Sequence, residues 1–192
     1  MIALPSEPND RILLAAVAAD DQAAYKTLFE SYYDRLHRLA FLITRSKELS
    51  EEIVSDVFIA LWRNRSHALD IANLRVYLYI ATRNTAMNYQ KKLQKKAVVR
   101  LDDLDVDLAD PYANPEQAFV TKEMDARIRA AIDALPPRCK MVFKLVKEDG
   151  LSYKEAAEVL GLSVGTVDNQ LVIAIKKIAS ALFYRFAPAS KK

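Results

Sequence analysis

Glycine is scarce in this chain, and its scarcity limits the folds that the sequence can adopt. Only three glycines occur among the 192 residues, namely Gly150, Gly161 and Gly165, and all lie in the C-terminal quarter. Tight hairpin turns need residues with positive φ, which glycine adopts at the least cost. Alanine, leucine, lysine and arginine are abundant instead, and these residues favour helices. We therefore expect an all-α fold.

Cysteine and histidine are also rare, which argues against several kinds of site. The single cysteine, Cys139, has no second cysteine with which to form an intramolecular disulfide or a zinc cluster. Its place in an apolar helical run indicates a buried structural thiol. Neither His37 nor His67 has a nucleophile or a metal-ligand partner nearby in sequence, and no glycine-rich phosphate loop occurs. We therefore expect that the protein is not an enzyme and has no catalytic residue, metal, cofactor or small-molecule substrate.

Long hydrophobic runs are absent as well. No apolar stretch approaches the roughly 20 residues that a membrane-spanning helix needs. The first ten residues lack the basic flank and the apolar run of a signal peptide. These two absences predict a soluble, cytoplasmic protein.

Charge is unevenly distributed, although the formal net charge is only +3. Residues 75–100 contain seven lysines or arginines and no acid, whereas residues 101–119 contain six acids and no base. The basic stretch suits a polyanion, and the acidic stretch indicates a segment with another task. Prolines within the acidic stretch stop helices there. We predict one helical domain over residues 10–98, an acidic linker over 99–118 and a second helical domain over 119–187.

The stretch 151–178 has the features of a helix-turn-helix. Ser152 and Glu155 make a capping box at the start of its first helix. Gly161 supplies the left-handed residue of the turn, and Ser163 caps the second helix. Four residues of that helix are expected to face inward: Val167, Leu171, Ile175 and Ile178.

Polar and basic side chains fall on or near the outer side of this helix-turn-helix. Amides can bond adenine in the major groove, an aliphatic side chain can touch a thymine methyl, and lysines can bind phosphates. A helical hairpin with a solvated polar face is the alternative, but the capping box, the turn glycine and the polar second helix coincide at the spacing of a DNA-binding motif. The predicted DNA contacts are Lys154, Ser163, Thr166, Asp168, Asn169, Gln170, Ile173, Lys176 and Lys177.

A basic helix with several tyrosines is expected over residues 74–95, with Asn73 as its cap. Cations can follow the phosphates of an unpaired strand while aromatic rings stack on its bases. In the alternative interpretation the tyrosines are core and the lysines only solvate a helix face. The lack of acids over residues 75–100 favours nucleic acid. The residues expected to face outward are Arg75, Tyr79, Arg83, Asn84, Asn88, Lys91 and Lys92.

Four blocks occur in order along the chain. They are LFESYYDRLHRLA (28–40), SEEIVSDVFIALW (50–62), YLYIATRNTAMNY (77–89) and a segment at 135–178 that begins LPPRCKMVF and ends in the helix-turn-helix. Together these blocks resemble the extracytoplasmic-function (ECF) subfamily of the bacterial sigma-70 RNA polymerase sigma factors, over roughly residues 20–182. The resemblance implies a sigma region 2-like domain followed by a sigma region 4-like domain.

The resemblance also implies partners and roles. The protein would bind the beta prime and beta subunits of core RNA polymerase and direct it to promoter DNA without catalysing a reaction. The third block would read the promoter −10 element, with Arg63 and Asn73 bounding a loop that holds one flipped base, and the helix-turn-helix would read the −35 element. The second block would contact the beta prime subunit through Glu51, Glu52 and Asp56, with Ile53, Val54 and Phe58 supporting or lining that surface.

The resemblance further implies an anti-sigma factor that buries these surfaces until a signal arrives, often from a membrane protein. The sequence departs from the family at Ser55, where glutamine is usual, and between Gln170 and Ile175, where basic residues are common. The alternative function is a stand-alone helix-turn-helix transcriptional regulator. Such regulators usually carry an α/β domain, whereas residues 10–100 show a helical period and no clear run of strands.

Overall fold

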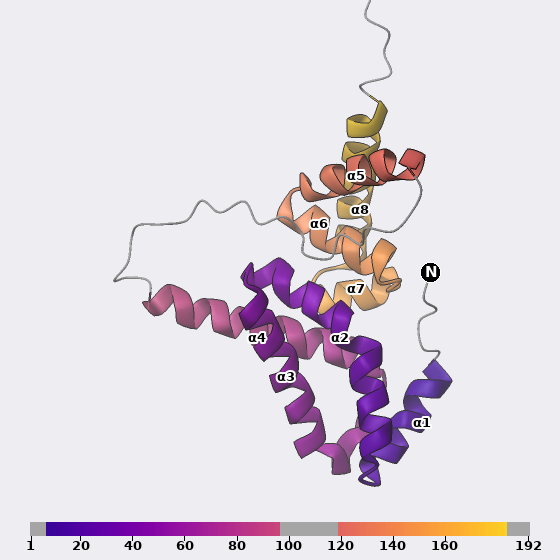
Figure 1. Ribbon diagram of the computed structural model, residues 1–192, viewed down its shortest axis with the longest axis vertical. Coiled ribbons are helices and arrows are strands. Elements are labelled where there is room, and N and C mark those ends of the chain that lie inside the picture. The colour runs from indigo at the N-terminus through magenta and orange to yellow at the C-terminus, as the bar shows by residue number, and fades with distance from the viewer. Residues whose placement is uncertain (1–6, 97–118, 184–192) are drawn as a thin grey trace, which may run out of the picture.

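The computed structural model describes the backbone of residues 7–96 and 119–183, and side chains within those ranges from residue 9 to 93 and from 124 to 182. Every regular element in those ranges is a helix (Figure 1). The predicted acidic linker, 99–118, and the end of the predicted second domain lie outside the described residues. The N-terminal domain comprises α1 (Glu7–Ala18), α2 (Gln22–Thr44), α3 (Lys47–Arg63), the 3₁₀ helix η1 (Arg65–Asp70) and α4 (Leu74–Lys96). The C-terminal domain comprises α5 (Phe119–Asp133), α6 (Pro137–Phe143), the π-helical turn η3 (Lys144–Glu148), α7 (Tyr153–Leu160) and α8 (Val164–Phe183).

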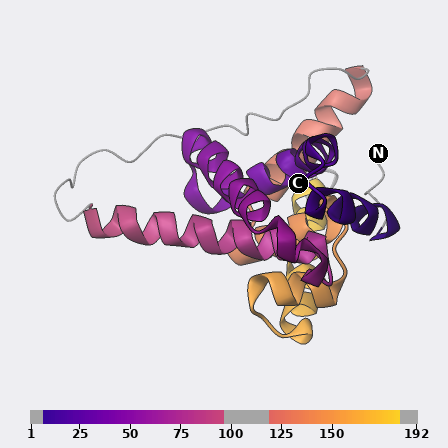
Figure 2. The same cartoon turned by 90° about the horizontal axis from the view of Figure 1, so that it is seen from below.

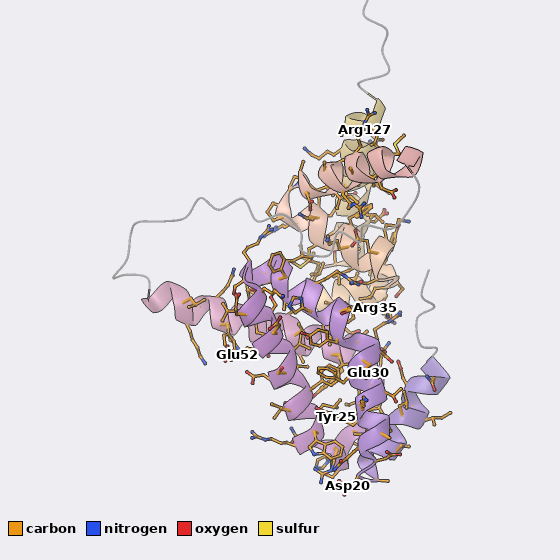
Figure 3. The ribbon with its side chains drawn as sticks, in the orientation of Figure 1. Asp20, Tyr25, Glu30, Arg35, Glu52 and Arg127 are labelled. Carbon is orange, nitrogen blue, oxygen red and sulfur yellow. The ribbon has the colours of Figure 1, made fainter. Side chains whose placement is uncertain are left out.

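The core of the N-terminal domain lies where α2, α3 and α4 pack together, while α1 packs on α2 and η1. Leu28, Phe58 and Leu78 are almost completely buried there. Tyr25 of α2 stacks edge-on against Phe58, with ring centroids 6.1 Å apart, and Figure 3 shows its place within this domain. Full burial of one such side chain contributes about 1.5–3 kcal/mol. These contacts hold α3 and α4 in a fixed relation to each other.

Local capping sets the limits of the helix-turn-helix as predicted. The Glu155 backbone N–H donates to Ser152 Oγ (3.2 Å), and the Ser152 N–H donates to Glu155 Oε2 (2.8 Å), which completes the capping box of α7. Gly161 ends α7 with φ of 65°, in the left-handed region that glycine tolerates best. Ser163 Oγ accepts the Thr166 N–H (3.1 Å) at the start of α8.

The inward stripe of α8 differs from the prediction at one position. Val167, Leu171 and Ala174 are buried, whereas Ile175 is 45% exposed, so its expected inward position was wrong. Two successive steps of four residues rotate a side chain by roughly 80° away from a helical stripe. A step of three after Leu171 brings Ala174 back to the stripe, and α5 and α6 pack on this side of α8. Cys139 is buried, as predicted, in an apolar cluster with Ile132, Leu135 and Ala174.

The two domains contact each other directly. Helix α7 packs against α4, and both views place it beside the N-terminal half of that helix (Figures 1 and 2). One continuous buried apolar cluster includes Leu78 and Tyr79 of α4 together with Leu145 and Val159 of the C-terminal domain. The described structure is therefore a closed arrangement of the two domains.

The length and hydrophobicity of the described helices show whether any of them could span a membrane. Among residues 7–96 and 119–183, no single helix is both long and apolar enough to cross a membrane. Only α7 and residues 164–182 of α8 taken together have the length and composition of a membrane span. The two helices are bent by 103° at the turn between them.

Glu155 makes the stability of the chain depend on pH. Burial raises its pKa, but hydrogen bonds from Arg75, Ser152 and Asn73 outweigh burial and lower the pKa from 4.5 to about 2. A carboxyl with a lowered folded-state pKa stabilises the fold above its unfolded pKa, and this stabilisation is lost as the pH falls through the folded value.

We expect the free energy of unfolding to fall more steeply between pH 4.5 and about 2 in the wild type than in Glu155→Gln. Glutamine keeps a capping box but does not titrate. Urea denaturation at fixed pH values across this range measures the difference. Parallel pH profiles for the two proteins would contradict the coupling.

Candidate nucleic-acid and polymerase interfaces

Helix α4 exposes a face with polar side chains between Tyr77 and Lys92. Asn84, Asn88, Lys91 and Lys92 are exposed there, which confirms the outward positions predicted for them. Tyr77 lies two helical turns before Asn84 on the same face, and it is 37% exposed. Sequence reasoning missed Tyr77, although its spacing of seven residues from Asn84 was the available signal. We call these five residues the open face of α4.

Tyr79, in contrast, was predicted to face outward, and this prediction was wrong. Its side chain is completely buried in the cluster shared by both domains. Two residues along a helix correspond to a rotation of roughly 200°, so Tyr77 and Tyr79 point to opposite sides. Burial raises the pKa of the Tyr79 hydroxyl, and the nearby Asp149 carboxylate raises it further. A ring buried in this way has no surface on which a base can stack.

Three other predicted −10 residues also lie on the side of α4 that meets the C-terminal domain. Asn73 caps α4, since its Oδ1 accepts the Val76 N–H at 3.1 Å, as predicted. Its Nδ2 donates to Glu155 Oε1 (3.2 Å), and a guanidinium nitrogen of Arg75 donates to the same oxygen (2.6 Å). Arg83 is half-buried and lines a cavity of about 360 Å³ between the domains. The closed arrangement thus engages or covers these side chains.

The segment between α3 and α4, predicted as a loop over Arg63–Asn73, is largely the 3₁₀ helix η1, and two hollows flank it. One cavity of about 380 Å³ is lined by residues of α1 and by Asn73, Ile71 and their neighbours. A second, of about 430 Å³, is lined by Tyr25, Trp62 and Arg63 among others. Arg63 itself is exposed. Each cavity is therefore lined by one residue of the predicted −10 set, Asn73 or Arg63, and by apolar side chains.

The carboxylates of α3 form an exposed acidic surface. Glu51, Glu52 and Asp56 are all exposed, and Figure 3 shows Glu52 on the outer side of α3. The Tyr89 hydroxyl lies 2.9 Å from both Glu52 Oε1 and Asp56 Oδ2 and shares its one proton between them. These two hydrogen bonds raise the pKa of Tyr89 and hold the carboxylates one turn apart in fixed positions.

Three apolar residues predicted to contact polymerase cannot do so directly. Ile53 and Val54 have no exposed surface, and Phe58 is 1% exposed. They face α2 and α4 because they occupy the apolar stripe of α3. Of the two roles expected for them, lining the polymerase-binding surface is therefore wrong, and supporting the acidic surface from below remains.

The predicted −35 residues mostly lie on the surface of the helix-turn-helix. Thr166 is half-buried, and its hydroxyl lies 2.8 Å from Ser163 Oγ. Gln170 is half-buried and its Oε1 accepts a hydrogen bond from Cys139 Sγ (3.0 Å), so this amide is turned toward the domain core. The expected outward position of Gln170 therefore fails in part. The exposed members of the set are Lys154, Ser163, Asp168, Asn169, Ile173, Lys176 and Lys177.

The fold and these surfaces define a two-domain, all-helical DNA-binding protein with a helix-turn-helix at its C-terminal end. The family profile described as Sigma-70 region 2 matches residues 28–96, and the profile described as Sigma-70, region 4 matches residues 125–178. Together these segments make up more than half of the chain. The chain belongs to the sigma-70 family, as a sigma factor of the ECF type.

Curated relatives carry the same description. The chain is 29% identical over 175 residues to the ECF RNA polymerase sigma factor SigE of Mycolicibacterium smegmatis, covering 86% of this chain but 66% of that protein, just under two thirds of its length. It is 26% identical over 178 residues to SigM of Mycobacterium tuberculosis, covering 93% and 87% of the two chains. Against the sigma-E factor of Escherichia coli K12 the identity is 27% over 174 residues, with 85% and 88% covered.

Solved structures share the fold. CnrH, in its complex with the cytosolic domain of CnrY, superposes with a TM-score of 0.59 at 23% identity, over 92% of this chain and 98% of CnrH. The sigma factor RpoE of Bartonella quintana, in complex with the anti-sigma factor NepR, gives 0.58 at 18% identity, over 82% and 96%. These likenesses support the architecture of two small helical domains.

Two neighbouring apolar residues of α3 differ in burial, since Phe58 lies in the core and Ile59 on the surface. We expect Phe58→Ala to lower the free energy of unfolding by about 3–5 kcal/mol, because it opens a cavity in the core. Its neighbour Ile59 is 46% exposed, and Ile59→Ala should change stability by at most about 0.5 kcal/mol. Chemical denaturation followed by circular dichroism measures both. Equal effects of the two substitutions would show that Phe58 is not a core residue.

Proposed function

We propose that this sigma factor binds core RNA polymerase through the acidic surface of α3 and reads promoters with two separate DNA surfaces. The open face of α4 would read the −10 element, and the helix-turn-helix would read the −35 element. The observation that carries this proposal is that two different domains each present an exposed polar face with lysines and amides. The protein itself would select promoters, and the polymerase would perform the chemistry.

The open face of α4 suits a strand with unpaired bases. The exposed ring of Tyr77 offers a surface for base stacking, while Lys91 and Lys92 can follow the phosphates. Asn84 and Asn88 lie between these two parts of the face and can hydrogen-bond base edges. A base extruded from the duplex needs a pocket to offset a few kcal/mol of unstacking, and the two cavities beside η1 supply candidates.

The helix-turn-helix suits duplex DNA. Asn169 near the start of α8 is exposed and can make a bidentate contact to adenine, and Ile173 one turn later can meet a thymine methyl. Lys176 and Lys177 would bind phosphates at the edge of the groove. Gln170 contributes to such readout only if it leaves Cys139, so we assign the specific contact to Asn169.

Polymerase binding is assigned to Glu51, Glu52 and Asp56, on the beta prime subunit, with a further contact to the beta subunit. Tyr89 already orders two of these carboxylates, so less side-chain entropy is lost on binding. The protein would act in the cytoplasm, where polymerase and chromosome are found. The structure of RpoE with the anti-sigma factor NepR supports an anti-sigma partner for this chain too.

Initiation with core polymerase tests the proposal. The purified chain should enable core polymerase to start at specific sites in a promoter library, which a stand-alone regulator would not do. Glu52→Gln with Asp56→Asn should weaken binding to core polymerase about tenfold, because two ordered charges are lost.

The matched control is Glu30→Gln with Asp34→Asn, which removes the same charge from exposed positions one turn apart on α2. It should leave the affinity for core polymerase unchanged. Fluorescence titration with labelled chain gives both affinities. Equal losses from the two pairs would mean that only the overall charge of the protein matters.

Two tyrosines on opposite sides of α4 test the assignment of the −10 surface. Tyr77→Ala should weaken binding to a single-stranded −10 oligonucleotide by about 1–3 kcal/mol, the usual contribution of base stacking. Tyr79→Phe keeps the buried ring and should not weaken that binding. Fluorescence anisotropy measures both, and a weaker complex for Tyr79→Phe but not for Tyr77→Ala would reverse the assignment.

A further inference from the structure

The cavity of about 360 Å³ between the two domains has the size of a small-molecule site. Residues of α2 and α4 line it on one side, and residues of α6, α7 and the turn before α8 line it on the other. Its volume lies within the roughly 300–1,000 Å³ of ligand pockets. We refer to it as the interdomain cavity. We propose that it binds a small amphipathic anion, with an aliphatic body and a carboxylate head, of the kind represented by a medium-chain fatty acid.

The walls of the interdomain cavity suit an aliphatic body. None of the described lining side chains is aromatic, so a nucleotide or another planar ligand would find no ring on which to stack. Two of the wall residues are methionines, whose flexible thioethers adapt to an irregular hydrocarbon. The large apolar residues of the wall are Ile43, Met87, Met141, Leu160 and Leu162.

Two arginines give the interdomain cavity a positive charge. Arg83 of α4 and Arg138 of α6 line it from different domains, and none of the described lining residues is acidic. Within the part of the chain that the structure describes, neither arginine forms an ion pair, and the Arg138 side chain makes no hydrogen bond. Arg83 has one long hydrogen bond, from Nη1 to Asn84 Oδ1 at 3.4 Å. Both guanidinium groups therefore keep donors for a ligand.

The remaining polar side chain of the cavity is already engaged. The Gln90 Nε2 donates to the backbone carbonyl of Ile43, which joins α4 to the end of α2. Recognition of a charged head is therefore left to Arg83 and Arg138.

A carboxylate matches these arginines better than other head groups do. Guanidinium and carboxylate groups form paired, charge-assisted hydrogen bonds that are roughly twice as strong as neutral ones. A neutral alcohol would leave the guanidinium charge without a counter-charge beside an apolar wall, which is unfavourable. A cationic head would be repelled. Among ligands with the same aliphatic body, the site should select the anion.

The site is complete only in the whole chain, because each domain supplies one arginine and part of the apolar wall. Its ligand would give the chain a direct chemical input in addition to the protein and DNA partners proposed above. The argument uses neither the polymerase assignment nor the promoter assignment, so this site stands or falls independently of them.

Three ligands with the same ten-carbon body test the proposal: decanoate, decanol and decyltrimethylammonium, each below its micellar concentration. Isothermal titration calorimetry with the purified full-length chain should show one saturable site for decanoate. Decanol should bind about tenfold more weakly, because it lacks the charge-assisted hydrogen bonds, and the ammonium compound should bind more weakly still. Decanoate should also raise the melting temperature, since a ligand of the folded state stabilises that state.

Two substitutions locate the ligand. Arg138→Gln should weaken decanoate binding about tenfold, whereas Arg129→Gln, which removes the same charge from an exposed position on α5 outside the cavity, should not. Met87→Glu places a carboxylate one turn after Arg83, where it can pair with that arginine and repel the ligand. It should abolish binding. Arg138 is exposed and Met87 is 37% exposed, so both variants should fold, which circular dichroism without ligand verifies.

Four results would overturn the proposal. Decanol binding as tightly as decanoate would show that the arginines do not select the head group. Equal affinities for Arg138→Gln and Arg129→Gln would place the ligand elsewhere, and binding that does not saturate would indicate adsorption to apolar surface. Decanoate might also bind only after replacement of four aspartates of the chain by asparagine, and the chain's own acidic segment would then be the occupant. Those aspartates are Asp102, Asp103, Asp105 and Asp107.

Discussion

The packing of α4 is the constraint on which the rest of the structure depends. One side of this helix completes the core with α2 and α3, a second side meets α7, and a third remains open to solvent. Since a helix advances by roughly 100° per residue, this division assigns each side chain to one task. Tyr77 is thereby available for stacking, whereas Tyr79 becomes part of the protein interior. The candidate −10 surface is defined by what the other helices leave uncovered.

Local chemistry explains why much of the fold could be predicted from the sequence. The capping box of Ser152 and Glu155, the left-handed Gly161 and the cap formed by Asn73 each depend on neighbours within four residues. Such features are encoded almost independently of the tertiary fold. The exposed lysines and amides of α4 and α8 were likewise predictable, because charged side chains seldom lie in a core.

The predictions that failed depended on contacts between distant segments. Tyr79 is buried because a separate domain covers it, and no periodicity within α4 indicates that cover. Gln170 turns inward because Cys139, on another helix, offers a donor. The spacing of the apolar residues in α3 already indicates that Ile53, Val54 and Phe58 are buried. The family resemblance nevertheless grouped them with the acidic residues of α3 in one polymerase-binding surface. The structure separates a buried layer, Ile53, Val54 and Phe58, from an exposed one, Glu51, Glu52 and Asp56.

Glu155 has two roles, since it completes a local helix cap and also joins the two domains. One carboxylate oxygen of Glu155 closes the capping box of α7, and the other accepts from Asn73 and Arg75, so the cap of α7 does not depend on the contact with α4. Partly buried ion pairs contribute little net free energy once desolvation is counted. The buried apolar cluster that includes Tyr79, Leu145 and Val159 therefore contributes most of the stability of the contact between the domains.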